Sequence, residues 1–456
     1  MIILLSHNTK MKKIFAIIVC FVCCGYASAQ QAYSLEQILD SAYKNNNAIH
    51  AAQLNLEAAQ HQRKEAFTKY FPSVSASGFW FNATKEMAKM TVNPSEMISP
   101  EVAAGLAQSL PAPVLTALAT PTSMSMLKKG VLASITAVQP VFAGGQIVHG
   151  NKLARVGEDV SRLQLKLSEN EVEKTAEEYF WQMASMQEKL KTIQASEALL
   201  NDIHKDVDVA VRSGVAMPND LLQVQLRQNE VASLKLKVQN ALSLYRMLLS
   251  QYCGLRDTSF VITYQTEEPS LLTTQSDPQQ ALLGTAEYQL LDKQVEAADI
   301  QRKITIGQNL PSVAVGVGYN YHNLLENDRS FGMVFATVNV PISDWWGASH
   351  AIKRKKIEQQ KAQEEKDDKS ELLKIRMQNA WNGVQESYQQ LSIAQRSIEQ
   401  AEENLRLNRN YYNAGTSKMS DLLEAQLLYQ QACDKRTDAF SNYQNKLLEY
   451  KHATAQ

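Results

Sequence analysis

Four residues that could bind a metal ion follow one another closely near the middle of the chain: Asp202, His204, Asp206 and Asp208. Carboxylates and imidazoles are the usual protein ligands of divalent metals. On a helix, however, Asp202 and Asp206 share one face while His204 points away from it. We therefore interpret the cluster as a solvated helix face and predict no metal site there.

Other residue types that support catalysis are scattered. The eight histidines follow no metal-binding spacing. The motif Gly316-Val317-Gly318 lies inside an alternating, strand-like segment and does not open a helix, so it predicts no phosphate-binding loop. A net charge of −1 argues against a nucleic-acid-binding surface. The sequence therefore predicts no catalytic residue, no cofactor, no nucleic-acid partner and no enzymatic activity.

Residues 1–29 have the pattern of a secretory signal peptide. Two lysines directly after Met11, which we expect to be the true start, precede an apolar run from Ile14 to Cys24. Ala27-Ser28-Ala29 then supplies the small residues of a cleavage site. The apolar run is too short for a permanent transmembrane helix. We expect cleavage after Ala29 and export of the chain.

The leader holds three of the five cysteines. A lipid-anchored Cys23 or Cys24 is the less favoured alternative to cleavage after Ala29. Cleavage would leave only Cys253 and Cys433, and two distant thiols do not make a disulfide framework. Stability must therefore come from packing and assembly.

Two stretches show the same stop and restart of a helix. "RSGVAMPNDLL" runs from Arg212 to Leu222, and "NAGTSKMSDLL" runs from Asn413 to Leu423. Gly415 follows Gly214 by 201 residues (415 minus 214). The same offset joins Asp220 to Asp421, Gln225 to Gln426 and Pro140 to Pro341. A constant offset over about 85 residues indicates an internal duplication.

A second match lies upstream and has a different offset. The segment Leu56–Val74 returns as Val295–Val313, 239 residues later (295 minus 56). The excess of 38 residues over the first offset (239 minus 201) places an insertion in the first half, at about Thr84–Lys129. This insertion is rich in Pro, Ser, Thr, Met and Ala, and we expect a long loop or lid there.

The duplication divides the mature chain into two structural repeats, residues 30–264 and 265–456. Each repeat is predicted to contain a helix, a pair of strands and a long helical hairpin. The strand pairs are expected at 72–82/131–142 and 311–321/332–342, and the hairpins at 146–251 and 347–450.

The strand segments alternate between two kinds of side chain. Val313, Val315, Val317 and Tyr319 alternate with small or polar residues over about ten positions. This length and period are typical of a transmembrane β-strand, although an amphipathic strand in a soluble sheet alternates equally well. Four strands are too few to close a barrel, and an open edge in lipid leaves backbone groups unpaired. Strands that cross a membrane would therefore require oligomerisation.

The helical segments are unusually long. No proline interrupts Gly145–Arg212, which would span about 100 Å as one helix. Apolar residues repeat at spacings of three and four, which predicts coiled-coil packing. Gly214 and Gly415 suit the left-handed conformation that ends a helix. Pro218 suits the first position of the next helix. The turns are therefore the tips of two long hairpins.

The duplicated layout, the strand pairs near Pro140 and Pro341, and the two tips resemble the outer-membrane efflux protein family, the TolC-like exit ducts. The resemblance covers roughly residues 31–452. It implies a mainly α fold with a membrane β part: a homotrimer in which four strands per chain form a 12-stranded barrel and long coiled-coil hairpins form an α-helical tunnel. It also implies an outer-membrane location, with the tunnel in the periplasm, and separate partners: a periplasmic adaptor (membrane fusion) protein and an inner-membrane pump.

The resemblance also assigns roles at the tips. The periplasmic aperture or gate falls on Asp220, Tyr412, Asp421 and Glu424. The contacts with the adaptor fall on eight residues: Arg212, Ser213, Gly214 and Val215 in the first tip, and Asn413, Ala414, Gly415 and Thr416 in the second. One position departs from the family: its tip arginine is replaced by Ser417, with Lys418 beside it. First-turn acids such as Asp220 and Asp421 also stabilise a helix N-terminus, so both roles stay open.

The sequence thus predicts the exit duct of a tripartite efflux or secretion system, a passive trimeric channel for small molecules. Two alternatives stay open. One is a soluble periplasmic coiled-coil scaffold or adaptor, which would purify without detergent. The other is the same duct serving protein secretion.

Overall fold

The computed structural model describes residues 32–455, apart from 86, 127, 257, 265–272 and 325–327. The predicted signal peptide and Met11 therefore lie outside the described residues. The chain divides into two compact units. The first comprises residues up to Ala59, Glu158–Val295 and Ala362–Gln456, and the second comprises Gln60–Gly157 and Glu296–Lys361.

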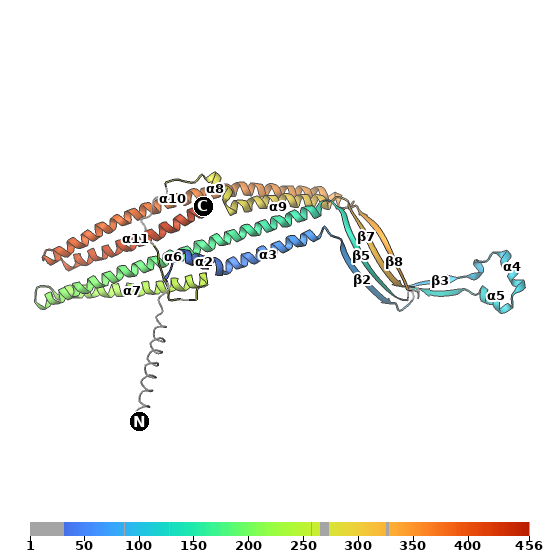
Figure 1. Ribbon diagram of the computed structural model, residues 1–456, viewed down its shortest axis with the longest axis horizontal. Helices are drawn as coiled ribbons and strands as arrows, with labels where there is room; N and C mark the ends of the chain where they lie inside the picture. Colours follow the sequence, from blue (N-terminus) through green and yellow to red (C-terminus); the bar gives the residue numbers. More distant parts are fainter. Residues whose placement is uncertain are drawn as a thin grey trace, which may run out of the picture. The chain divides into compact units, whose positions relative to one another are not determined.

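The first unit is helical. Its main elements are two hairpins, in which α6 (Gln146–Arg212) is followed by α7 (Pro218–Cys253) and α10 (Trp345–Asn413) by α11 (Met419–Thr454) (Figure 1). The shorter elements are α2 (Leu35–Asn45), α3 (Asn47–Thr68), α8 (Pro278–Gly284), α9 (Ala286–Gln308) and the parallel strands β1 (Ala32–Tyr33) and β6 (Val261–Ile262). The helices α3, α6, α9 and α10 continue into the second unit. Within the described part of the chain, no helix combines the length and apolar character needed to cross a membrane.

Apolar residues from both hairpins form the core of the first unit. Val224, Val231 and Val238 are buried and recur every seven residues on α7, which is the spacing of a coiled-coil seam. Phe180 on α6 and Tyr443 on α11 belong to one buried cluster. Burying each such side chain contributes about 1.5–3 kcal/mol, so the two hairpins stabilise each other.

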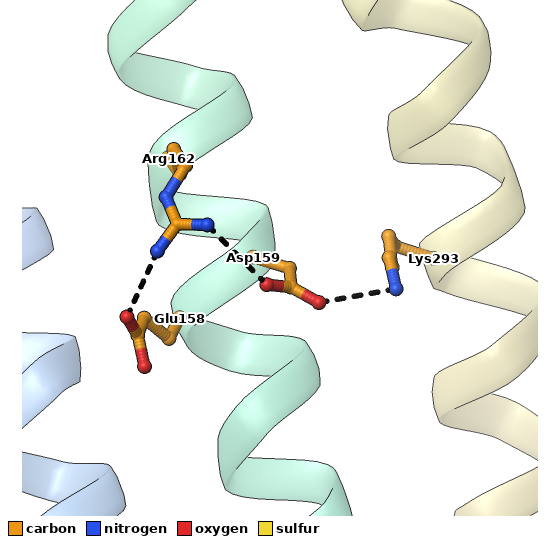
Figure 2. Close-up of polar contacts among 4 residues, drawn as sticks. All are labelled: Glu158, Asp159, Arg162 and Lys293. Atoms are coloured by element: carbon orange, nitrogen blue, oxygen red, sulfur yellow. Dashed lines mark hydrogen bonds and ion pairs between the residues drawn. The ribbon is translucent and has the colours of Figure 1, made fainter.

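Ion pairs connect α9 to the long helices beside it. Figure 2 shows Arg162 of α6 between Glu158, at 3.0 Å, and Asp159, at 4.0 Å. Lys293 of α9 reaches Asp159 at 3.1 Å. The neighbouring Asp292 pairs with Lys366 of α10 at 2.7 Å. Because adjacent helical residues point in different directions, two consecutive residues bind α9 to helices of both repeats.

The second unit contains a four-stranded antiparallel sheet in the order β2-β5-β7-β8 (Figure 1). The strands are β2 (Ser73–Asn82), β5 (Lys129–Ala143), β7 (Ser312–Asn323) and β8 (Asp328–Asn339). Strand β8 ends three residues before its expected end at 342 and starts four residues before its expected start at 332. Pro341 lies in the connection after β8, whereas Pro140 lies inside β5 beside a shift in the ladder register, a place where proline is tolerated.

The insertion in the first repeat is folded, so the expectation of a long loop was wrong. It forms an antiparallel pair, β3 (Ala88–Val92) with β4 (Thr122–Met126). The helices η1 (Pro94–Glu96), α4 (Pro100–Ser109) and α5 (Ala112–Ala119) lie between these strands in the chain. Proline is favoured in the first turn of a helix, and each of these helices carries one at N1 or N2. The prolines that suggested a loop therefore start helices.

Two glycines let the backbone approach closely where β5 meets α6. Gly144 has φ +59°, and a Cβ added there would lie 2.1 Å from the carbonyl oxygen of Gly307, near the end of α9. A Cβ at Gly307 would lie 2.3 Å from the carbonyl oxygen of Gly144. Only glycine fits both positions, and this contact fixes the start of α6 against the end of α9 within the second unit.

Substituting Gly144→Ala should destabilise the protein by about 2 kcal/mol or more, because the added methyl meets backbone and the conformation is left-handed. Gly150→Ala is the matched control: the site is helical, and no atom lies within 4 Å of the added Cβ. It should be neutral or stabilise by about 0.5–1 kcal/mol. Thermal unfolding in detergent measures both, and equal midpoints for the two variants would contradict the prediction.

Candidate functional site: the turns between the long helices

The two turns that the sequence singled out share one backbone conformation. Gly214 has φ 75° and Gly415 has φ 72°, both left-handed. The N–H of Gly214 donates to the carbonyl of Val211, and that of Gly415 donates to the carbonyl of Tyr412. These bonds satisfy carbonyls that the ending helices leave free. The expectation of helix-ending glycines is therefore confirmed at both turns.

The predicted acids cap the helices that restart. Asp220 accepts a hydrogen bond from the backbone N–H of Met217 at 3.3 Å, through Oδ2. Asp421 accepts from the N–H of Lys418 at 3.2 Å and from the Ser417 hydroxyl at 3.0 Å. These bonds hold the pKa of the Asp421 carboxyl below its usual range, and the bond from the Lys418 backbone has the larger effect. At the position where the sequence departs from the family pattern, Lys418 therefore binds Asp421 through its backbone N–H.

Tyr412 connects the two tips. Its side chain is half-buried against an apolar cluster of Ile203, Val207, Val224, Met419 and Leu422, which come from both hairpins. Burial raises the pKa of the Tyr412 hydroxyl, and the negative charges of Asp220 and Asp206 raise it further. The structure therefore packs Tyr412 of the second hairpin against a cluster to which the first hairpin contributes.

The other predicted site residues lie on the surface. Asp421 and Glu424 are exposed on the first turns of α11. All eight predicted adaptor-contact residues are exposed: Arg212, Ser213, Gly214, Val215, Asn413, Ala414, Gly415 and Thr416. Val215 is 84% exposed, and Met217 beside it is 72% exposed. The tips therefore present apolar side chains to solvent, a property that suits a surface covered by another protein.

A half-buried arginine that the sequence did not single out joins the hairpins behind the tips. Arg227 of α7 donates from Nε to Gln426 at 3.0 Å and from Nη2 to Gln430 at 3.3 Å, both on α11. It also pairs with Glu230 at 2.8 Å. Gln426 and Gln430 are almost fully buried. The sequence signal was two glutamines four residues apart, which places both on one face of α11.

A second polar bridge joins α6 to α11. Lys189 lies 2.7 Å from Asp438, whose carboxylate also accepts from the Ser185 hydroxyl at 3.1 Å. One turn away on α11, burial raises the pKa of the Asp434 carboxyl. The contact between the hairpins therefore alternates between apolar clusters and polar groups, of which Gln426 and Gln430 are buried and Asp438 is exposed.

The acid and histidine cluster before the first tip is held by pairs along its own helix. Asp208 binds Arg212 at 2.8 Å, and Asp202 lies 3.4 Å from Lys205. His204 lies 3.5 Å from Gln225 of α7, so it points away from the acids. In the described part of the chain, no group of three or more His, Cys, Asp or Glu side chains could hold a metal ion.

Solved structures share this fold over most of the chain. The Campylobacter jejuni CmeC outer membrane channel aligns over 92% of this chain and 85% of its own, with a TM-score of 0.73 and 13% identity. The Vibrio cholerae outer membrane protein VceC aligns over 92% of this chain and 95% of its own, with a TM-score of 0.71 and 14% identity. The Neisseria gonorrhoeae MtrE outer membrane channel in its open state aligns over 92% of this chain and 88% of its own, with a TM-score of 0.69 and 13% identity.

The sequence comparisons reach a shorter segment. The comparison with curated proteins found no match. The family model described as outer membrane efflux protein matches residues 278–454, which span α8 to α11 and the strands β7 and β8. The resemblance in the sequence is confirmed in this part of the chain, which matches the family model, and over 92% of its length the chain shares the fold of a solved outer-membrane channel.

Proposed function

We propose that this protein is the outer-membrane exit duct of a tripartite efflux system. Three copies close a barrel in the outer membrane, and their long hairpins form a tunnel in the periplasm. The duct is passive and non-catalytic: an inner-membrane pump supplies the energy, and a periplasmic adaptor joins pump and duct. The family match of residues 278–454 and the shared fold with outer-membrane channels support this proposal.

The four-stranded sheet is the observation that carries the proposal. Strand directions alternate, so the edge strands β2 and β8 run in opposite directions. Strand β8 of one copy can therefore pair antiparallel with β2 of the next, and such head-to-tail pairing closes a ring. Three copies of four strands give twelve, an even number as in bacterial outer-membrane barrels.

A soluble scaffold fits the sheet poorly. Val74 and Val334 lie on one face of the sheet and are 70% and 84% exposed. On the other face Phe79 is 62% exposed. A small soluble β domain would cover at least one face. Lipid on one face and a water-filled lumen on the other give both faces a suitable environment.

The tips supply the periplasmic aperture in this proposal. Asp220, Tyr412, Asp421 and Glu424 place acidic and phenolic groups at the turns, and three copies would form rings of negative charge. Such rings favour cations. The exposed turns beside them, including Val215, are the surfaces that receive the adaptor. The capping bonds of Asp220 and Asp421 are compatible with this role, because one carboxylate oxygen can cap while the charge faces water.

The double variant Asp220→Asn/Asp421→Asn tests the aperture. An amide oxygen still accepts the bonds from the N–H groups of Met217 and Lys418, so the helix caps persist while the charge is lost. Planar-bilayer recordings of detergent-purified protein should show cation selectivity reduced several-fold relative to the unsubstituted channel, with single-channel openings retained.

Asp40→Asn is the control for the aperture test, since Asp40 is an exposed acid on α2 that pairs with Lys44. It should leave the selectivity unchanged. Equal selectivity in all three proteins would remove these acids from the gate and keep the duct. A detergent-independent monomer without conductance would exclude the duct and favour the scaffold.

Deleting residues 86–126 and joining the ends through Asn-Gly should leave assembly and channel formation intact. The β2–β5 ladder ends in its own pair, Asn82 with Lys129, and is followed by a bond from Ala83 N–H to the Lys128 carbonyl. The sheet therefore does not need the β3–β4 pair. Oligomeric state in detergent and bilayer conductance measure the outcome. Loss of the oligomer would show that the insertion belongs to the assembly interface.

A further inference from the structure

The two faces of the β2-β5-β7-β8 sheet differ in chemistry, and the register assigns each residue to one of them. Directly opposite residues share a face. One row joins Val74 of β2, Ala137 of β5, Val317 of β7 and Val334 of β8. Toward the ends of β2 and β7, the rows on this face contain Tyr319, Tyr321 and Trp80, and the last two of these rows also contain polar residues of β7 and β8. An apolar band with an aromatic rim is the pattern of a lipid-facing surface.

The opposite face is mostly small and polar. Ser77 and Ser134 lie opposite each other there, with their hydroxyl oxygens 2.8 Å apart. Thr136 of β5 lies opposite Gly318 of β7 on the same face. In the proposed barrel, this face lines the water-filled lumen.

Large apolar side chains interrupt the polar face at one end of the sheet. Phe79 and Phe81 lie near the end of β2, and their rings stack with centroids 5.9 Å apart. Phe331 and Met333 lie near the start of β8, at the same end because the strands are antiparallel along the sheet. Phe79 and Phe331 are 62% and 48% exposed. Aromatic rings exposed on a lumen-facing surface are not required by the fold of a porin-like barrel, whose interior is polar.

Glycines on β7 make room for this apolar surface. A Cβ at Gly316 would lie 2.3 Å from the ring of Phe335, its partner across the ladder. A Cβ at Gly318 would lie 3.4 Å from Met333. The side chains of β8 therefore lie over the β7 backbone, which packs them in a fixed arrangement.

The two apolar groups lie on the two edge strands, and within one chain His322 of β7 and Arg329 of β8 share their face at this end of the sheet. When β8 of one copy pairs with β2 of the next, Phe331 and Met333 come onto the strand beside Phe79 and Phe81 of the neighbour, on the same face. The neighbouring copy thus completes the apolar surface at every junction of the ring.

We propose that Phe79 and Phe81 of one copy and Phe331 and Met333 of the next form an apolar collar in the lumen of the barrel. The collar narrows the aqueous path and binds aromatic or apolar organic molecules as they leave. This inference rests on the proposed trimeric duct. Apolar constrictions restrict water and ions, and aromatic rings favour ring-to-ring contacts with cargo.

The test is bilayer recording of the full-length, detergent-purified protein and its Phe79→Ser/Phe331→Ser variant. The variant should conduct roughly twofold more than the unsubstituted channel, because the apolar constriction is removed. Triphenylphosphine oxide, an uncharged molecule with three phenyl rings, serves as the aromatic probe and should block the unsubstituted channel. Its block should weaken about tenfold in the variant, as expected for loss of one or two aromatic contacts.

Two further variants control for folding. Phe79→Leu/Phe331→Leu keeps the side chains apolar, and its block should also weaken because the rings are gone. Val74→Ser/Val334→Ser changes the same strands on the opposite face and should leave both conductance and block unchanged. Unchanged conductance and block in both phenylalanine variants would overturn the collar and keep the duct. An unsubstituted protein that forms no channel would overturn the duct and the collar with it.

Discussion

The unpaired edges of the β2-β5-β7-β8 sheet are the constraint on which the rest of this protein depends. Each edge strand carries a row of backbone N–H and C=O groups along its outer side, and hydrocarbon offers these groups no partner. A single chain cannot satisfy them with four strands. Because the four strands alternate in direction, the edge strands β2 and β8 run in opposite directions. The β8 edge of one copy can therefore pair antiparallel with the β2 edge of another. In the proposed barrel, assembly therefore follows from the sheet before any helix is considered.

The helical hairpins are stabilised by contacts of a different kind. Long helices gain stability from seams, and a seven-residue apolar spacing on α7 supplies one. The contact between the hairpins differs from this seam. Arg227 with its two glutamines, and Lys189 with Asp438, place hydrogen-bonded polar groups among the apolar clusters. Buried polar contacts contribute little net stability but are costly to misalign, so the contacts of Arg227 with the buried Gln426 and Gln430 fix the register of one hairpin on the other.

The sequence predicted the features that repetition or backbone chemistry reveals. The offset of 201 residues located both turns, and Gly214 and Gly415 take the left-handed conformation that was expected of them. Strand alternation located the sheet to within a few residues. These features are local, and a local pattern is sufficient to predict them.

Features that depend on distant partners were missed. The close approach of Gly144 and Gly307 joins residues 163 positions apart (307 minus 144), and nothing near either glycine indicates it. The role of Arg227 depends on α11, nearly 200 residues later. The insertion was misread for a different reason: its prolines start short helices, and composition alone does not distinguish that use from a loop. At the tips, the capping bonds came from the structure, whereas the gate role still rests on resemblance and proposal.

The proposed aperture and the proposed collar would select by different physics. The aperture acts through the charge of Asp220 and Asp421, and salt screens charge: the Debye length falls from about 10 Å at 0.1 M to about 3 Å at 1 M. The collar acts through Phe79 and Phe331, whose contacts with an apolar molecule carry no charge to be screened, and salts such as sulfate strengthen apolar contact. Cation selectivity should therefore fade as salt rises while block by an aromatic molecule persists. Two filters with opposite salt dependence would let one duct reject anions at its tips and delay apolar cargo in its barrel, each without altering the other.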